Sequence, residues 1–252
     1  MNSVSWLRPL KRSWATTLDV LFPPQCDFCS LELEATGEHG QLCVGCRSQL
    51  TKVAERVCQR CGCPVPQVSS PDGRCAHCRK LELRFLRVAP YGWYRDELKQ
   101  AVKRMKHSSH ESLTVTIAKF AANRWASQLA DFQADLVTCV PSHWSRRFQR
   151  GTHAPENLAR EASRSLRAPV LPRLMACRRK VNKQSMLSFA DRALNVQGAF
   201  RVTKGYDIRD ARIVLVDDVL TTGATANEAT KELLVAGAAG VAVAVVARAL
   251  PL

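Results

Sequence analysis

Residues 213–225, IVLVDDVLTTGAT, restrict the possible folds of this 252-residue chain more than any other stretch. Four apolar residues, 213–216, are followed by two aspartates and then by a small, hydroxyl-rich segment. A short apolar run that leads through small residues into a helical pattern is typical of a buried strand followed by a helix. Because parallel strands need helical crossovers, the stretch predicts an α/β fold with a ligand site at the carboxyl ends of its strands.

The rest of residues 85–248 supports this interpretation, because short apolar runs alternate there with helical patterns. We predict strands at 85–94, 136–140, 213–216 and 240–248, and helices at 96–105, 113–129, 156–166 and 226–236. Such alternation predicts βαβ units around a parallel sheet. Residues 178–198 are polar and basic without a clear period, so we predict a long loop of the kind that closes over ligands.

Residues 217–225 carry the chemistry of a site for a phosphorylated sugar. Backbone N–H groups at a helix N-terminus and three threonine hydroxyls can cradle a monophosphate. The carboxylates of Asp217 and Asp218 precede this cradle and suit the two vicinal hydroxyls of a ribose. The predicted phosphate-binding residues are Thr221, Thr222, Gly223, Ala224 and Thr225.

Nine of the eleven cysteines lie within residues 25–80, a region with little else to form a core. Eight of them form four Cys-x-x-Cys pairs: Cys26/Cys29, Cys43/Cys46, Cys58/Cys61 and Cys75/Cys78. Two such pairs supply the four soft ligands of a tetrahedral site, so we predict two structural Zn²⁺ ions. We expect consecutive pairs to share an ion, although a crossed arrangement also fits and Cys63 and His77 are alternative ligands. A module this small needs the metal to fold.

The cysteine pattern and both ends of the chain favour a cytoplasmic protein. Cys-x-x-Cys pairs indicate metal binding in a reducing compartment and not a disulfide framework. Residues 1–22 have the spacing of a short amphipathic helix and lack the continuous apolar core of a signal peptide. The apolar tail, residues 233–252, is interrupted by Gly237 and Gly240 and contains Arg248, so we predict no transmembrane segment there.

The charge of the chain is strongly positive, with 37 Lys and Arg against 22 Asp and Glu and a formal net charge of +15. Between Val140 and Lys183 there are eleven basic residues and only two acids, so this stretch alone supplies +9. Such a stretch suits a polyanion, either a nucleic acid or a phosphorylated small molecule. A merely solubilising surface is the alternative interpretation. Lys106 belongs to a second basic group, near residue 105, for which a solvated face is the simpler expectation.

The string at 213–225 resembles the phosphoribosyl-pyrophosphate (PRPP) motif of type I phosphoribosyltransferases. Over nearly the whole chain, the order of its motifs resembles the ComF family of competence-associated, phosphoribosyltransferase-like proteins. Beyond the cysteines and the PRPP motif, the matching residues are Val140, Pro141, Arg146, Arg150, Gly151, Leu158, Ala159, Gln184, Leu187, Arg192, Asn195, Gly198 and Phe200. Where many members have Phe-Asn-Gln after Arg150-Gly151, this chain has Thr-His-Ala, which leaves the chemistry toward an acceptor open.

The resemblance implies a type I phosphoribosyltransferase-like parallel sheet flanked by helices and preceded by a small zinc-ribbon module. It divides the chain into an N-terminal helix at 1–22, a double zinc-ribbon module at 23–82 and a phosphoribosyltransferase-like domain at 83–252. It also implies that Asp217 and Asp218 hold the ribose of PRPP, that the threonine-rich segment holds the 5′-phosphate, and that Mg²⁺ accompanies the ligand. Further candidates for contacts with phosphate or pyrophosphate are Ser142, Arg150, Arg146, Arg179, Gln184 and Arg192.

Three functions fit the sequence. The first, which we favour, is a PRPP-binding protein of the ComF type that acts in DNA uptake on the cytosolic side of the membrane and binds single-stranded DNA. The second is an active phosphoribosyltransferase of nucleotide salvage, for which the sequence names no acceptor and contains no recognisable base-specificity loop. The third is a scaffold whose zinc module docks a DNA-uptake helicase or channel protein.

Overall fold

The computed structural model describes residues 23–33, 41–52, 57–65, 74–79, 81–141, 154–179, 181 and 189–249. The helix predicted for residues 1–22 lies outside this part of the chain. So do four of the predicted site residues: Ser142, Arg146, Arg150 and Gln184. The backbone of Arg192 is described, but its side chain is not.

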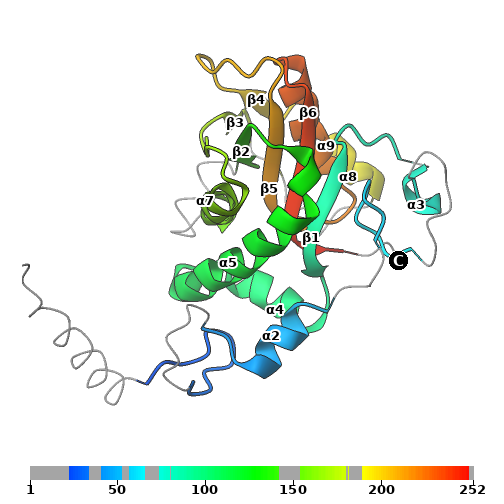
Figure 1. The fold of residues 1–252 in the computed structure, drawn as a ribbon. Helices are drawn as coiled ribbons and strands as arrows, with labels where there is room; N and C mark the ends of the chain where they lie inside the picture. Colours follow the sequence, from blue (N-terminus) through cyan, green and yellow to red (C-terminus); the bar gives the residue numbers. More distant parts are fainter. Residues whose placement is uncertain are drawn as a thin grey trace, which may run out of the picture.

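Four parallel strands form the main sheet, in the order β1-β6-β5-β2 (Figure 1). They are β1 (Arg87–Trp93), β2 (Leu136–Cys139), β5 (Arg212–Leu220) and β6 (Gly240–Arg248). The two central strands are long and largely buried, as expected for apolar strands covered on both faces. The parallel sheet predicted from the sequence is therefore confirmed.

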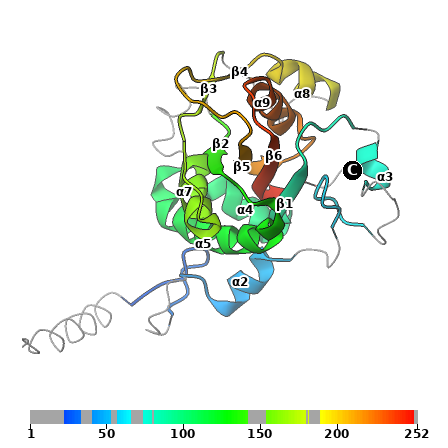
Figure 2. The ribbon, with the colours of Figure 1, turned by 45° about the horizontal axis from the view of Figure 1, so that its top comes forward.

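Helices cover both faces of this sheet (Figure 2). One face carries α4 (Asp96–Arg104), α5 (Glu111–Gln128) and α7 (Ala154–Leu166); short 3-10 turns at Ser108–His110 and Ala130–Phe132 flank α5. The other face carries α9 (Ala224–Val235), which packs against α8 (Phe189–Val196). Alternate side chains of β5 point to opposite faces of the sheet. Val214 and Val216 pack with α5 and α7, whereas Ile213 and Leu215 pack with α9.

Two predictions of secondary structure were wrong. The segment predicted as a loop, residues 178–198, contains α8, and it is flanked by a two-stranded antiparallel sheet of β3 (Met175–Cys177) and β4 (Phe200–Val202). In addition, β5 does not end at Val216 but continues through both aspartates to Leu220, because β6 pairs with it along its full length. The aspartates therefore lie within the last part of a strand and not after it.

The cysteine-rich module consists of two ribbons. The first ribbon (residues 23–33 and 41–52) contains α2 (Val44–Leu50), and the second ribbon (residues 57–65 and 74–79) contains α3 (Ala76–Arg79). The first ribbon packs on α4 and α5, where the carboxylate of Asp27 accepts hydrogen bonds from Ser112 and Thr116 at 2.5 and 2.6 Å. No helix in the described part of the chain is long and apolar enough to cross a membrane.

Candidate functional site

The phosphate loop, Thr221–Thr225, joins the carboxyl end of β5 to the start of α9. Gly223 is the residue before the first turn of α9 and has a φ of 86°, a left-handed conformation that glycine adopts without steric cost. The hydroxyl of Thr222 accepts a hydrogen bond from the N–H of Ala224 at 3.3 Å. The first N–H groups of a helix have no partner within the helix, and together with the positive end of the helix dipole they favour an anion at such a position.

The linker between the second ribbon and β1 supports this loop from the side. The side chain of Asn227, in the first turn of α9, accepts from the N–H of Arg84 at 2.6 Å and donates to the carbonyl of Glu82 at 2.9 Å. A Cβ atom at Gly223 would meet the ring of Phe85 at 3.7 Å. The cysteine-rich module is therefore connected directly to the helix that follows the phosphate loop.

Asp217 and Asp218 lie four and three residues before the phosphate loop, respectively, and are both half-buried. Oδ1 of Asp217 accepts a hydrogen bond from the N–H of Asp218 at 2.8 Å. Burial, together with the negative charge of Asp218, raises the pKa of Asp217 well above its ordinary value. A carboxyl group whose pKa is strongly raised by burial and a neighbouring charge is a frequent mark of a functional site.

Lys106, which follows α4, is the site residue that the sequence did not identify. Its Nζ lies 3.1 Å from Oδ2 of Asp218, and the two side chains are 33% and 21% exposed. The charge of Asp218 raises the pKa of Lys106. The prediction that this lysine lies on a solvated face was therefore wrong. Although it is 112 residues away in the sequence, its ammonium group neutralises part of the negative charge of the two aspartates.

We expect Lys106→Met to destabilise the fold at neutral pH by about 1–2 kcal/mol, because it leaves two half-buried carboxylates without their cation. For a chain of this length, each kcal/mol corresponds to about 2–4 °C in melting temperature. Because the pKa of Lys106 is raised by folding, the ion pair stabilises fully below the ordinary lysine value of about 10.4, and this contribution is lost as the pH rises through the folded-state pKa. Thermal unfolding at neutral pH measures the effect.

Lys103→Met is the matched control, since Lys103 is an exposed residue of α4, one turn earlier. It should change the melting temperature by less than about 2 °C, as is usual for substitutions at exposed positions. Equal losses in both variants would contradict the proposed importance of the Lys106–Asp218 pair.

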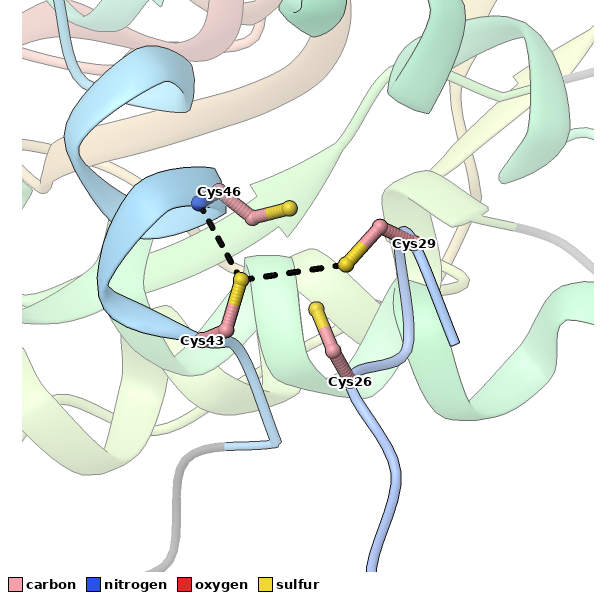
Figure 3. A group of neighbouring side chains, drawn as sticks. All are labelled: Cys26, Cys29, Cys43 and Cys46. Atoms are coloured by element: carbon pink, nitrogen blue, oxygen red, sulfur yellow. Dashed lines mark hydrogen bonds between the residues drawn. The ribbon is translucent and has the colours of Figure 1, made fainter. Parts of the chain in front are cut away.

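The eight paired cysteines come together in two groups of four. Cys26, Cys29, Cys43 and Cys46 form the first cluster, and Cys58, Cys61, Cys75 and Cys78 form the second. In Figure 3 the four sulfur atoms of the first cluster point toward a common centre, two from a turn and two from the start of α2. Sγ of Cys43 also accepts a hydrogen bond from the N–H of Cys46 at 3.4 Å. The grouping is the one predicted from consecutive pairs, without Cys63 or His77 as ligands.

The sulfur positions fit a zinc ion. A tetrahedral site with Zn–S bonds of about 2.3 Å places its sulfur atoms about 3.8 Å apart. The observed Sγ–Sγ distances are 3.7 Å between Cys29 and Cys43, and 3.8 Å between Cys58 and Cys78. None of the eleven cysteines, all of which the structure describes, forms a disulfide. Both clusters are thus complete four-thiol sites without an open position, as structural zinc requires.

Of the other predicted site residues, Arg179 is the one whose side chain is described. Its Nη2 donates to the carbonyls of Asn195 and Gln197 at 3.1 and 2.8 Å, so the guanidinium stabilises the C-terminal end of α8. The structure therefore gives Arg179 a role in the fold, and its contact with pyrophosphate stays a prediction. The residues brought together are Lys106, Asp217, Asp218 and the phosphate loop.

Two family models match the chain. A double zinc ribbon domain matches residues 17–80, and a phosphoribosyl transferase domain matches residues 156–250, which includes the phosphate loop and both aspartates. Competence protein F of Haemophilus influenzae is 29% identical over 197 residues, covering 76% of this chain and 83% of the relative. The DNA utilization protein YhgH of Escherichia coli is 29% identical over 224 residues, covering 88% and 95%.

The chain is a homologue of competence protein F and of the YhgH proteins, with a double zinc ribbon followed by a phosphoribosyl transferase domain. Both halves of the molecule take part in the likeness, since the relatives match across the ribbons as well as the sheet. Among solved structures, the hypoxanthine-guanine phosphoribosyl transferase of L. donovani is 13% identical and covers 54% of this chain and 67% of its own, with a TM-score of 0.34. The two family models and the parallel sheet together show a phosphoribosyltransferase-like sheet preceded by two ribbons for structural zinc.

Proposed function

We propose that this chain is a protein of the ComF type that binds PRPP, or a closely related phosphoribosyl ligand, and acts in DNA uptake. The observation that carries the proposal is the position of the carboxylate pair and Lys106 next to the phosphate loop. The loop would bind the 5′-phosphate through the first turn of α9, and Asp217 and Asp218 would accept hydrogen bonds from the two ribose hydroxyls.

Lys106 completes the arrangement with a mobile positive charge. In the free protein it pairs with Asp218 at 3.1 Å. When ribose hydroxyls engage Asp218, the ammonium group would be free to turn toward the pyrophosphate of the ligand, since a lysine side chain is long and flexible. Bound Mg²⁺ would come with the pyrophosphate, whose hard oxygens it prefers, and would neutralise part of its charge.

The role in DNA uptake rests on the relatives, which are named for competence and for DNA utilization. The basic stretch between Val140 and Lys183 suits single-stranded DNA, which we propose as a second ligand. A fall of its affinity with salt, with a slope of about −0.7 per phosphate contacted, is the expected signature. We place the protein in the cytoplasm, where reducing conditions keep free thiols available to zinc. A helicase or channel protein of DNA uptake remains its proposed protein partner.

Calorimetric titration with PRPP, ribose 5-phosphate and pyrophosphate, each with Mg²⁺, tests the ligand. PRPP combines all the groups that the site would contact, so we expect it to bind at least about tenfold more tightly than either fragment, a difference of about 1.4 kcal/mol. A chain with a net charge of +15 would attract any polyphosphate. If PRPP binds no better than pyrophosphate, the binding is only electrostatic and the proposed site is wrong.

Catalysis is a second candidate function, favoured by the same carboxylate pair. In that case PRPP would lose pyrophosphate as an acceptor attacks C1′, and the residues of the chain would contribute positioning and charge stabilisation. Release of pyrophosphate in the presence of candidate acceptors distinguishes a transferase from a protein that only binds the ligand.

A further inference from the structure

The guanidinium of Arg248 lies between the second ribbon and the phosphate loop. Arg248 is the last residue of β6, is only 2% exposed, and pairs in the sheet with Leu220 at the end of β5. Its own carbonyl accepts a hydrogen bond from the N–H of Tyr94 at 2.9 Å, which fixes the main chain on the other side. The side chain therefore starts from a fixed main-chain position at the carboxyl end of a central strand.

One side of the guanidinium contacts the entry to the phosphate loop, and the other contacts the second cluster. Nη1 donates to the carbonyl of Leu220 at 3.0 Å and also to the carbonyl of Thr221. Nε donates to the carbonyl of Cys61, a predicted zinc ligand, at 2.8 Å, and Nη2 donates to Sγ of Cys63 at 3.2 Å. A single planar group thus bridges the second ribbon and the phosphate loop, which lie far apart in the sequence.

Among the residues that the structure describes, no carboxylate forms an ion pair with Arg248. Within the described residues, its hydrogen bonds go to main-chain carbonyls, including that of Ala249 at 2.5 Å, and to one thiol. A buried cation is costly unless negative charge lies close to it. Four thiolates around one Zn²⁺ carry a net charge of about −2, so the metal-loaded second cluster supplies that negative charge.

We propose that Arg248 is a positioning residue that couples metal binding at the second cluster to ligand binding at the phosphate loop, an inference that rests on the function proposed for that loop. The carbonyl of Thr221 and the N–H of Thr222 belong to one peptide plane, so fixing the carbonyl also fixes the N–H that would face the phosphate. Loss of zinc would free the carbonyl of Cys61 and remove one anchor of the guanidinium. Because such coupling is reciprocal, bound ligand should also retain the zinc.

Zinc release from the full-length, zinc-loaded protein tests the coupling without any substitution. A chelator is added with and without saturating PRPP and excess Mg²⁺, and cysteines that become free are alkylated and located by mass spectrometry. We expect PRPP to slow the release from the second cluster at least about fivefold, the lower end of typical allosteric coupling, and to leave the first cluster unchanged. If PRPP binds but protects neither cluster, or protects both equally, the inference is overturned.

Arg248→Lys keeps the positive charge but lacks the planar fork that reaches several acceptors at once. We expect this variant to bind PRPP about tenfold more weakly and to lose the protection of the second cluster. Arg47→Lys is the matched control, because Arg47 also joins a ribbon to the domain, by stacking on Phe120 at 4.7 Å, but on the first ribbon. It should behave as the wild type does in both assays.

Hydrogen exchange of the ligand-free protein separates a failure of this inference from a failure of the proposed function. Arg248→Lys should speed the exchange of the amides of residues 221–225 at least about fivefold, whereas Arg47→Lys should not. If the wild type binds no PRPP, the proposed function fails and the exchange result alone decides the role of Arg248. Unchanged exchange in Arg248→Lys would show that the guanidinium does not position the loop.

Discussion

Serine at both Cys61 and Cys78 is expected to lower the zinc content from two ions per chain to one and to unfold the second ribbon. In the described part of this ribbon the buried cluster consists of five cysteines, with Val65 and Leu83 packed against it. So little apolar area cannot offset the conformational entropy of the segment. Structural zinc supplies an apparent binding free energy of about 10–16 kcal/mol in zinc-finger peptides, and that term would be lost.

The parallel sheet should stay folded in this variant, because its core clusters contain no residue of the second ribbon. Metal analysis should find one zinc ion per chain, and limited proteolysis should cut within the ribbon while the sheet resists. Cys177→Ser is the control, since Cys177 is a partly buried thiol that lies outside both clusters and forms no disulfide. Retention of two zinc ions by the double variant would mean that the second cluster is not a metal site.

The first ribbon should respond differently to the matched double variant, Cys26→Ser with Cys46→Ser. Both cysteines belong to the main core, together with Leu42 and Leu50, and they pack there with residues of α4 and α5. Loss of this zinc is therefore expected to lower the melting temperature of the whole domain and not only to open a ribbon. The contrast arises because one ribbon is part of the main core and the other is attached to its edge.

The sequence predicted those features that depend on local pattern. Apolar runs located three of the four strands of the main sheet to within a few residues, and the Cys-x-x-Cys spacing predicted how eight thiols divide into two clusters. Where the pattern was weak, the prediction was wrong. The helix α8 has an exposed leucine, Leu194, and lies in a polar stretch, and β3 and β4 are only three residues long, so neither leaves a clear periodic signal.

Long-range contacts of charged residues were beyond reach of the sequence alone. Lys106 contacts a carboxylate 112 residues away, and Arg248 contacts the carbonyl of Cys61 across 187 residues. Lysine and arginine are usually solvated, so neither composition nor spacing marks these two as buried or paired. These two contacts depend on the order of the strands in the sheet, in which β1, β6 and β5 lie side by side.

The double variant Asp217→Asn with Asp218→Asn is expected to weaken the binding of PRPP at least about 100-fold. A hydrogen bond to a charged group contributes about 1.5–3 kcal/mol, and the proposed site makes such bonds from both carboxylates to the ribose. Asparagine keeps the size of the side chain and an oxygen that can accept from the N–H of residue 218, so the main chain should be undisturbed. Calorimetry with PRPP and Mg²⁺ measures the loss.

The melting temperature of the same double variant serves as a control, because the pKa of Asp217 is raised in the folded protein. A carboxyl group whose pKa is raised by folding destabilises the native state increasingly as the pH rises above its ordinary value, 3.8, toward the folded-state pKa, because its ionised form is the less favoured one. Removing the charge of Asp217 relieves this cost, whereas Asp218→Asn breaks the ion pair with Lys106. The double variant should therefore lose no more stability at neutral pH than Lys106→Met does, about 1–2 kcal/mol, while ligand binding is lost. A large loss of stability would assign the aspartates to the fold, whereas binding lost with stability retained would assign them to the ligand.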